Sequence, residues 1–151
     1  MFKVQVGSSV IKILLILFLG ICAVFDIRKK EIPLILILIG IFFSSGINIW
    51  QIYDKNITVA ETGAALAVGV FMICVSFCTR ERIGYGDGFI LIVSGLMLGF
   101  YQCFLGLCIS LVFSSVCALF LLITHKAGKD SGLPFVPFLT VGMGVSFFVQ
   151  M

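Results

Sequence analysis

The chain has 151 residues, of which 61% are hydrophobic and only 11% are charged, with a mean hydropathy of +1.25. Soluble domains carry about 25% charged residues, so this composition excludes an ordinary soluble domain and indicates an integral membrane protein. The net charge of +3 comes from a few residues between apolar runs, which gives no reason to expect nucleic-acid binding.

Five apolar runs, separated by charged clusters, follow one another along the chain: residues 11–25, 33–52, 59–79, 89–124 and 133–151. About 20 apolar residues in a helix are needed to cross a hydrocarbon core about 30 Å thick. The first run is slightly short, and residues 7–11 can extend it. No small-x-small cleavage site follows it, so we interpret it as a retained first span rather than a signal peptide.

The run over residues 89–124 is too long for one span, because a continuous helix of this length would reach roughly 54 Å. We expect a turn near residues 100–103 (FYQC), where aromatic residues and a glutamine suit the membrane interface. This division predicts an all-α membrane protein with six transmembrane helices in one domain, residues 1–151. Small residues within the spans, namely the pairs Gly95/Gly99 and Gly142/Gly144, favour close helix packing inside this bundle.

Lys and Arg are unevenly divided between the two sides of the predicted bundle. One side holds Lys3, Lys12 and Lys55, and the other holds Arg28, Lys29, Lys30, Arg80, Arg82, Lys126 and Lys129. The side richer in Lys and Arg faces the cytoplasm in most membrane proteins, so we expect both termini to be extracytoplasmic. This orientation places Asp26 and Asp87 at the cytoplasmic boundary of an inner or plasma membrane.

The six cysteines all lie inside apolar runs, without a close CxxC pair: Cys22, Cys74, Cys78, Cys103, Cys108 and Cys117. Cys74 and Cys78 share a helical face, but two thiols without further ligands make a poor metal site. We interpret the cysteines as small packing residues, and we expect neither a metal nor a cofactor.

Three stretches on the predicted cytoplasmic side are candidates for a functional site: FDIRKKEIP (25–33), GYGDG (84–88) and KDSGLPFVPFLTVG (129–142). In the first, Pro33 fits the first turn of the second span, where its missing N–H costs nothing. Taken alone, Asp26 is more often a boundary residue among solvated charges than a catalytic one. In the third, Pro134 and Pro137 predict a bent or irregular entry into the last span, with a plain helix start as the alternative.

The GYGDG stretch has a structural and a catalytic interpretation. Asp is a good helix N-cap, and the fourth span begins directly after Asp87. That interpretation explains Asp87 but does not require the alternating glycines Gly84, Gly86 and Gly88. Glycines remove side chains, so another helix or an extended peptide backbone can approach closely, which would be useful if a substrate must reach the carboxylate.

If the fold brings Asp26 and Asp87 together, both cannot comfortably be ionised, and the pair shares one proton. One carboxylate then takes a proton from a water that attacks a peptide carbonyl. The other donates a proton to the developing oxyanion and later to the leaving amine. Because such a pair titrates as a unit, neither residue is assigned the base role alone. A helix N-terminus behind Asp87 favours its charged form, which is a weak indication that Asp26 holds the proton.

With these motifs, the chain resembles the type IV prepilin peptidases, membrane aspartic proteases that share GxGD with archaeal preflagellin peptidases and, distantly, with presenilin. The resemblance rests on an Asp followed by basic residues and Ile-Pro (DIRKKEIP), on Gly84-Tyr85-Gly86-Asp87, on the Pro-Phe-x-Pro-Phe-Leu segment 134–139 and on six spans. It therefore covers nearly the whole chain. It implies that Asp26 and Asp87 are the catalytic pair. It also implies pilin-like precursors as partners, whose short basic leaders are cut at the cytoplasmic boundary, usually after a glycine and just before a hydrophobic helix.

The chain departs from the family pattern at Leu34, where many members have Asn, and at Phe89, where many have Lys. These departures concern substrate contacts more than the chemistry. Larger bifunctional members also N-methylate the mature pilin and carry a cytoplasmic segment with paired CxxC motifs. Nothing like that segment fits within DIRKKEIP, so the resemblance predicts a peptidase without methyl transfer.

Two other classes of function compete with the peptidase. A small transporter would place ionisable groups near the bilayer midplane, whereas the charged residues here lie at run ends or in loops. A catalytically inactive scaffold of a pilus or secretion assembly is the other alternative, and the presence of both aspartates weighs against it.

Overall fold

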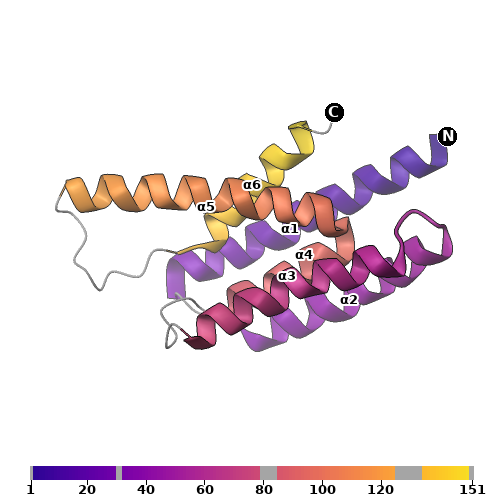
Figure 1. Cartoon of the computed structure of the whole chain (residues 1–151), viewed down its shortest axis with the longest axis horizontal. Helices are drawn as coiled ribbons and strands as arrows, with labels where there is room; N and C mark the ends of the chain where they lie inside the picture. Colours follow the sequence, from indigo (N-terminus) through magenta and orange to yellow (C-terminus); the bar gives the residue numbers. More distant parts are fainter. Residues whose placement is uncertain (1, 30–31, 79–84, 125–133, 150–151) are drawn as a thin grey trace.

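The structure, a computed structural model, describes residues 2–29, 32–78, 85–124 and 134–149. Within these residues all regular elements are α-helices: α1 (Phe2–Lys29), α2 (Leu34–Tyr53), α3 (Val59–Cys78), α4 (Tyr85–Leu98), α5 (Phe100–Ile123) and α6 (Val136–Val149). Figure 1 shows successive helices running in alternating directions along one long axis. The predicted all-α fold with six helices is confirmed.

The helices fall into two length classes. Four are long and apolar enough to cross a bilayer, over Ser9–Lys29, Leu34–Tyr53, Val59–Cys78 and Phe100–Leu121. Helices α4 and α6 have 14 residues each. They are about 21 Å long, which is less than the hydrocarbon thickness of about 30 Å. The six predicted spans are therefore four full-length helices and two shorter ones.

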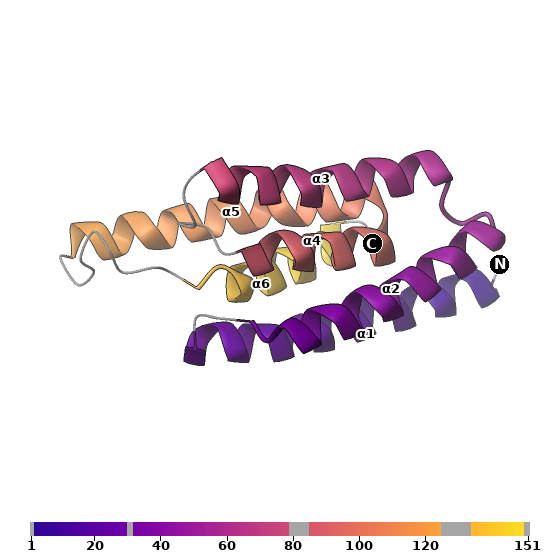
Figure 2. The ribbon, with the colours of Figure 1, turned by 90° about the horizontal axis from the view of Figure 1, so that it is seen from below.

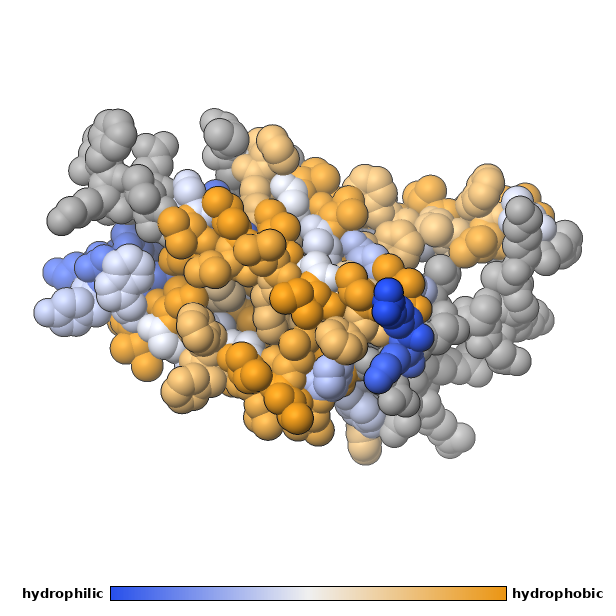
Figure 3. Space-filling view, turned by 180° about the vertical axis from the view of Figure 1, so that it is seen from behind, coloured by the Kyte–Doolittle hydropathy of each residue, from blue (hydrophilic) through white to orange (hydrophobic). Residues whose placement is uncertain are grey.

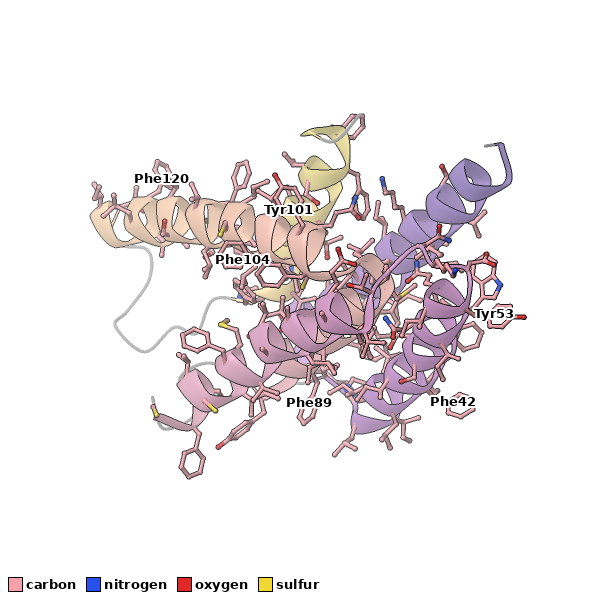
Figure 4. All side chains as sticks on the ribbon, turned by 45° about the vertical axis from the view of Figure 1, so that its right-hand side comes forward. Phe42, Tyr53, Phe89, Tyr101, Phe104 and Phe120 are labelled. Carbon is pink, nitrogen blue, oxygen red and sulfur yellow. The ribbon has the colours of Figure 1, made fainter. Side chains whose placement is uncertain are left out.

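The outer surface carries the apolar side chains that a lipid environment requires. Phe42 is 82% exposed and Phe120 is 66% exposed, and both point away from the bundle (Figure 4). The face in Figure 3 is mostly apolar between two more polar ends. Large exposed apolar surfaces mark membrane contact, so the chain is a multi-pass membrane protein.

The long apolar run is divided at Gly99, one residue before the predicted turn. Gly99 has a φ of +80°, and its N–H donates to the Gly95 carbonyl oxygen at 2.8 Å. This left-handed glycine ends α4, and α5 doubles back from Phe100 (Figure 2). Residues 100–103 form the first turn of α5, so the predicted division of the run is confirmed and the turn itself lies at the adjacent Gly99. The reversal needs a positive φ, which glycine adopts without strain and the aromatic residues do not.

We expect Gly99→Ala to lower the free energy of unfolding by about 1–2 kcal/mol, because a Cβ disfavours the left-handed conformation. A Cβ at Gly99 would make only an ordinary van der Waals contact, at 3.6 Å from Ile57 Cδ1. The expected loss of stability therefore comes from the backbone conformation and not from a steric clash. Thermal unfolding in detergent micelles measures the effect. Gly144→Ala is the matched control, because a Cβ there meets nothing within 4 Å. Equal stability of the two variants would show that the turn tolerates a side chain.

Helix α4 lies at the centre of the bundle. It contacts α1, α2, α3 and α5, and Figure 2 shows it between α3 on one side and α1 and α2 on the other. Its C-terminal carbonyls, which have no partner within the helix, accept hydrogen bonds from α2. Asn48 Nδ2 donates to Leu96 O at 2.9 Å, and Gln51 Nε2 donates to Met97 O at 3.1 Å. These side-chain amides supply hydrogen-bond donors to main-chain carbonyls at a helix end that lies inside the bundle.

Small residues bring the backbones of α3 and α4 into contact. A Cβ at Gly69 would lie 3.0 Å from Ile92 N and 3.1 Å from Gly88 O, and a Cβ at Gly95 would lie 3.0 Å from Ala65 Cβ. The predicted close packing at Gly95 is confirmed, whereas its expected partner Gly99 caps the helix instead.

In the second predicted glycine pair, Gly142 and Gly144, only one glycine lies at a close helix–helix contact. A Cβ at Gly142 would lie 2.6 Å from Gly106 O, so α6 packs closely on α5 at this point. Gly144 faces open space and does not take part in this contact. The prediction of a packing pair at Gly142 and Gly144 therefore holds for Gly142 alone.

Candidate active site

Three helix ends meet at one end of the bundle. The end of α1, the start of α4 and the start of α6 lie close to one another in both ribbon views (Figures 1 and 2). Asp26 lies in the last turn of α1, Asp87 is the third residue of α4, and Val136 is the first residue of α6. The fold therefore brings the described residues of all three predicted motifs to the same end of the bundle.

Asp26 is buried, with 8% of its surface exposed. Its Oδ2 accepts a hydrogen bond from the main-chain N–H of Val136 at 3.0 Å. The main-chain N–H of Phe135 also forms a hydrogen bond with this carboxylate. Helix α1 continues to Lys29, so Asp26 lies one turn inside the helix rather than among solvated charges. The alternative of a plain boundary residue is wrong, because Asp26 caps the start of α6.

Asp87 is buried to the same degree, with 7% of its surface exposed. Helix α4 begins at Tyr85, so Asp87 lies inside the first turn and the N-cap interpretation is wrong. A carboxylate in the first turn of a helix is stabilised by the helix dipole. Asp87 is close enough to Asp26 for the two carboxyl groups to interact electrostatically.

The two carboxyl groups thus share an environment suited to one negative charge. Both are buried, and the N-termini of two helices, α4 and α6, meet around them. Each helix N-terminus acts as roughly half a positive charge. Two buried like charges so close favour a shared proton, which is the protonation state that acid–base hydrolysis by a carboxyl pair requires.

The glycines around Asp87 serve contacts within the chain. A Cβ at Gly88 would lie 3.2 Å from Ile73 N, so the predicted approach of another helix is confirmed here, and that helix is α3. A Cβ at Gly86 would lie 2.8 Å from Ile32 Cδ1, so a side chain from the α1–α2 connection covers this position. The approach of a substrate backbone at these glycines stays a prediction. Gly84 lies outside the described residues.

The predicted prolines lie at helix starts, with two differences of position. Pro33 is the N-cap of α2 rather than a residue of its first turn, and its carbonyl accepts from Leu36 N at 2.9 Å. Pro134 precedes α6 and Pro137 is its second residue, with Pro134 and Phe135 in irregular backbone. The irregular entry into α6 is confirmed, and it presents main-chain N–H groups to Asp26.

The contribution of the α6 backbone was not recognised from the sequence, because every residue except proline has a main-chain N–H and the sequence does not show which of them will contact a carboxylate. The two prolines were its only available signal. Ile32, which covers Gly86, was also missed. In the part of the chain that the structure describes, no three His, Cys, Asp or Glu side chains gather as a metal site would require.

One comparison with known proteins returned a match. The sequence model described as the type IV leader peptidase family matches residues 13–123, which include both aspartates and end before α6. No curated protein and no solved structure matches the chain.

Proposed function

The chain belongs to the type IV leader peptidase family, and we propose that it is an aspartic endopeptidase whose catalytic pair is Asp26 and Asp87. The observation that carries the proposal is the convergence of two buried, electrostatically interacting carboxyl groups from α1 and α4. Isolated buried carboxylates are costly, so a pair held at the meeting point of three helix ends is better explained by chemistry than by stability.

The pair supports peptide hydrolysis without a covalent intermediate. With one shared proton, the ionised carboxylate accepts a proton from the attacking water while the protonated carboxyl group donates to the carbonyl oxygen. The tetrahedral intermediate then collapses, the C–N bond breaks, and the leaving amine takes a proton from the pair. The N-termini of α4 and α6 stabilise the negative charge that develops during these steps.

The proposed substrates are pilin-like precursors with a short basic leader followed by an apolar helix. A substrate with an apolar helix can approach laterally through the membrane, and both carboxyl groups lie in the terminal turn of a helix, near where the helix of such a substrate would begin. The Lys and Arg distribution supports a cytoplasmic location for this end of the bundle. The short connection between α1 and α2 supports peptidase activity without N-methylation.

We expect wild-type chain to remove the leader of a pilin-like precursor encoded in the same genome. The two are co-expressed in a host without a leader peptidase of its own, and the intact mass of the product is measured. The expected mass is that of the mature protein with an unmodified N-terminus. The precursor expressed alone is the control and stays full length. A full-length precursor in the presence of the enzyme would contradict the proposal for that substrate class, and an added methyl group would contradict its peptidase-only part.

A further inference from the structure

We infer that the main-chain N–H of Val136 is a positioning group for Asp26, holding its Oδ2 as the unprotonated oxygen of the pair. The inference rests on the proposed function, in which Asp26 is catalytic. The hydrogen bond of 3.0 Å joins residues 110 positions apart in sequence. Val136 lies beyond the stretch matched by the family model, residues 13–123. The role therefore follows from the tertiary structure of this chain.

Asp26 needs an external donor because of its place in α1. It lies in the last turn, at the negative end of the helix dipole, where an anion is disfavoured. The start of α6 supplies the opposite dipole end and a directed N–H. Asp87 also lies at the N-terminus of a helix, so the helix dipoles alone do not favour ionisation of one aspartate over the other. The hydrogen bond to Asp26 does distinguish them, because it favours the charged form of Asp26.

The prolines determine which N–H groups face the carboxylate. Pro134 and Pro137 have no N–H, so they bracket Phe135 and Val136, the two residues whose N–H groups act on Asp26. The first turn of α6 thus offers a donor at its first position and none at its second. This arrangement limits the main-chain donors near the start of α6 that face the Asp26 carboxylate to these two.

Packing holds the donor in place relative to α1. The Val136 and Leu139 side chains are fully buried in the core. One turn further into the bundle, Thr140 Oγ1 donates to the Val136 carbonyl oxygen of its own helix at 2.9 Å and lies 3.4 Å from Leu19 O on α1. Buried packing therefore holds the start of α6 against α1 and limits movement of the Val136 N–H relative to Asp26.

The decisive variant is Val136→Pro, which deletes the N–H and also replaces the buried valine side chain with a proline ring. Proline is well accepted at the first position of a helix, and Phe135, the residue that would then precede it, lies in irregular rather than helical backbone. We expect kcat to fall by about 30- to 100-fold, because a misplaced catalytic group costs up to about 100-fold. KM should change by less than about threefold, since substrate contacts are unaltered. Val136→Ala keeps the N–H and truncates the same buried side chain, so the kcat loss that Val136→Pro shows beyond it is the part due to the N–H.

Amide exchange gives a second measurement that does not depend on cleavage. In protein labelled at valine and leucine and held in micelles, the Val136 amide should exchange at least about tenfold faster in Asp26→Ala than in wild type. The Leu139 amide is the internal control, because it donates to Phe135 O at 3.0 Å and should stay protected in both proteins. If Val136→Pro fails to fold, this comparison still tests the contact.

The outcomes separate this inference from the proposed function. Equal kcat in Val136→Pro and Val136→Ala, or equal Val136 exchange with and without Asp26, would overturn the positioning role while cleavage by wild type stands. Absence of cleavage by wild type would overturn the proposed function. In that case the exchange measurement would still report whether the Val136 N–H depends on Asp26.

Discussion

Asp26→Asn and Asp87→Asn should each reduce precursor cleavage by about 1,000-fold or more. An amide cannot share or exchange the proton that the pair must move, and general acid–base groups contribute about 100- to 10,000-fold to rate. Because the two residues act as one unit, the double variant should lose no more than about as much as either single variant. Asparagine is close to aspartic acid in shape, so both buried sites remain packed. Leader removal is followed by mass spectrometry on purified enzyme and precursor.

Asp54→Asn is the matched control, because Asp54 is an exposed aspartate at the opposite end of α2. We expect it to cleave at the wild-type rate. Thermal unfolding of all three variants shows that lost activity does not reflect lost fold. Cleavage above about a tenth of the wild-type rate by Asp26→Asn or Asp87→Asn would exclude the carboxyl pair as the catalytic unit.

Gly69→Val should lower the free energy of unfolding by about 2–3 kcal/mol. A Cβ at Gly69 would lie 3.0 Å from Ile92 N and 3.1 Å from Gly88 O, so main-chain atoms of α4 must move. Gly88 directly follows Asp87, and displacement of α4 displaces the carboxylate with it. We therefore expect a kcat loss of about 100-fold even where the variant folds, since about 1 Å of misplacement has that cost.

Gly63→Val provides the comparison on the same helix, because a Cβ at Gly63 meets nothing within 4 Å. It carries the same change in side chain and in helix propensity without the contact. Unfolding in micelles and cleavage of the precursor are measured for both variants. Similar stability and activity in the two would show that α3 and α4 can separate at no cost, contrary to the close approach at Gly69.

Local features of the sequence predicted much of the architecture. Hydropathy and charge are properties of neighbouring residues, and they indicated a multi-pass all-α protein and the division of the apolar run over residues 89–124. They did not indicate that α4 and α6 are too short to cross a bilayer unaided. A run of apolar residues shows where a helix can form, whereas its ends depend on turns such as Gly99 and on caps from other helices.

The sequence by itself determined the membrane class, the six helices and the identity of two candidate acids. Side-chain chemistry and hydropathy are properties of individual residues and their neighbours in sequence, so no tertiary contact is needed to recognise them. Only the tertiary structure decided that Asp26 caps α6 through Val136 and that Gly88 packs on α3. Both contacts involve main-chain atoms of different helices. Main-chain groups are the same at every residue except proline. Their partners therefore depend on how the helices pack and cannot be inferred from residue identity alone.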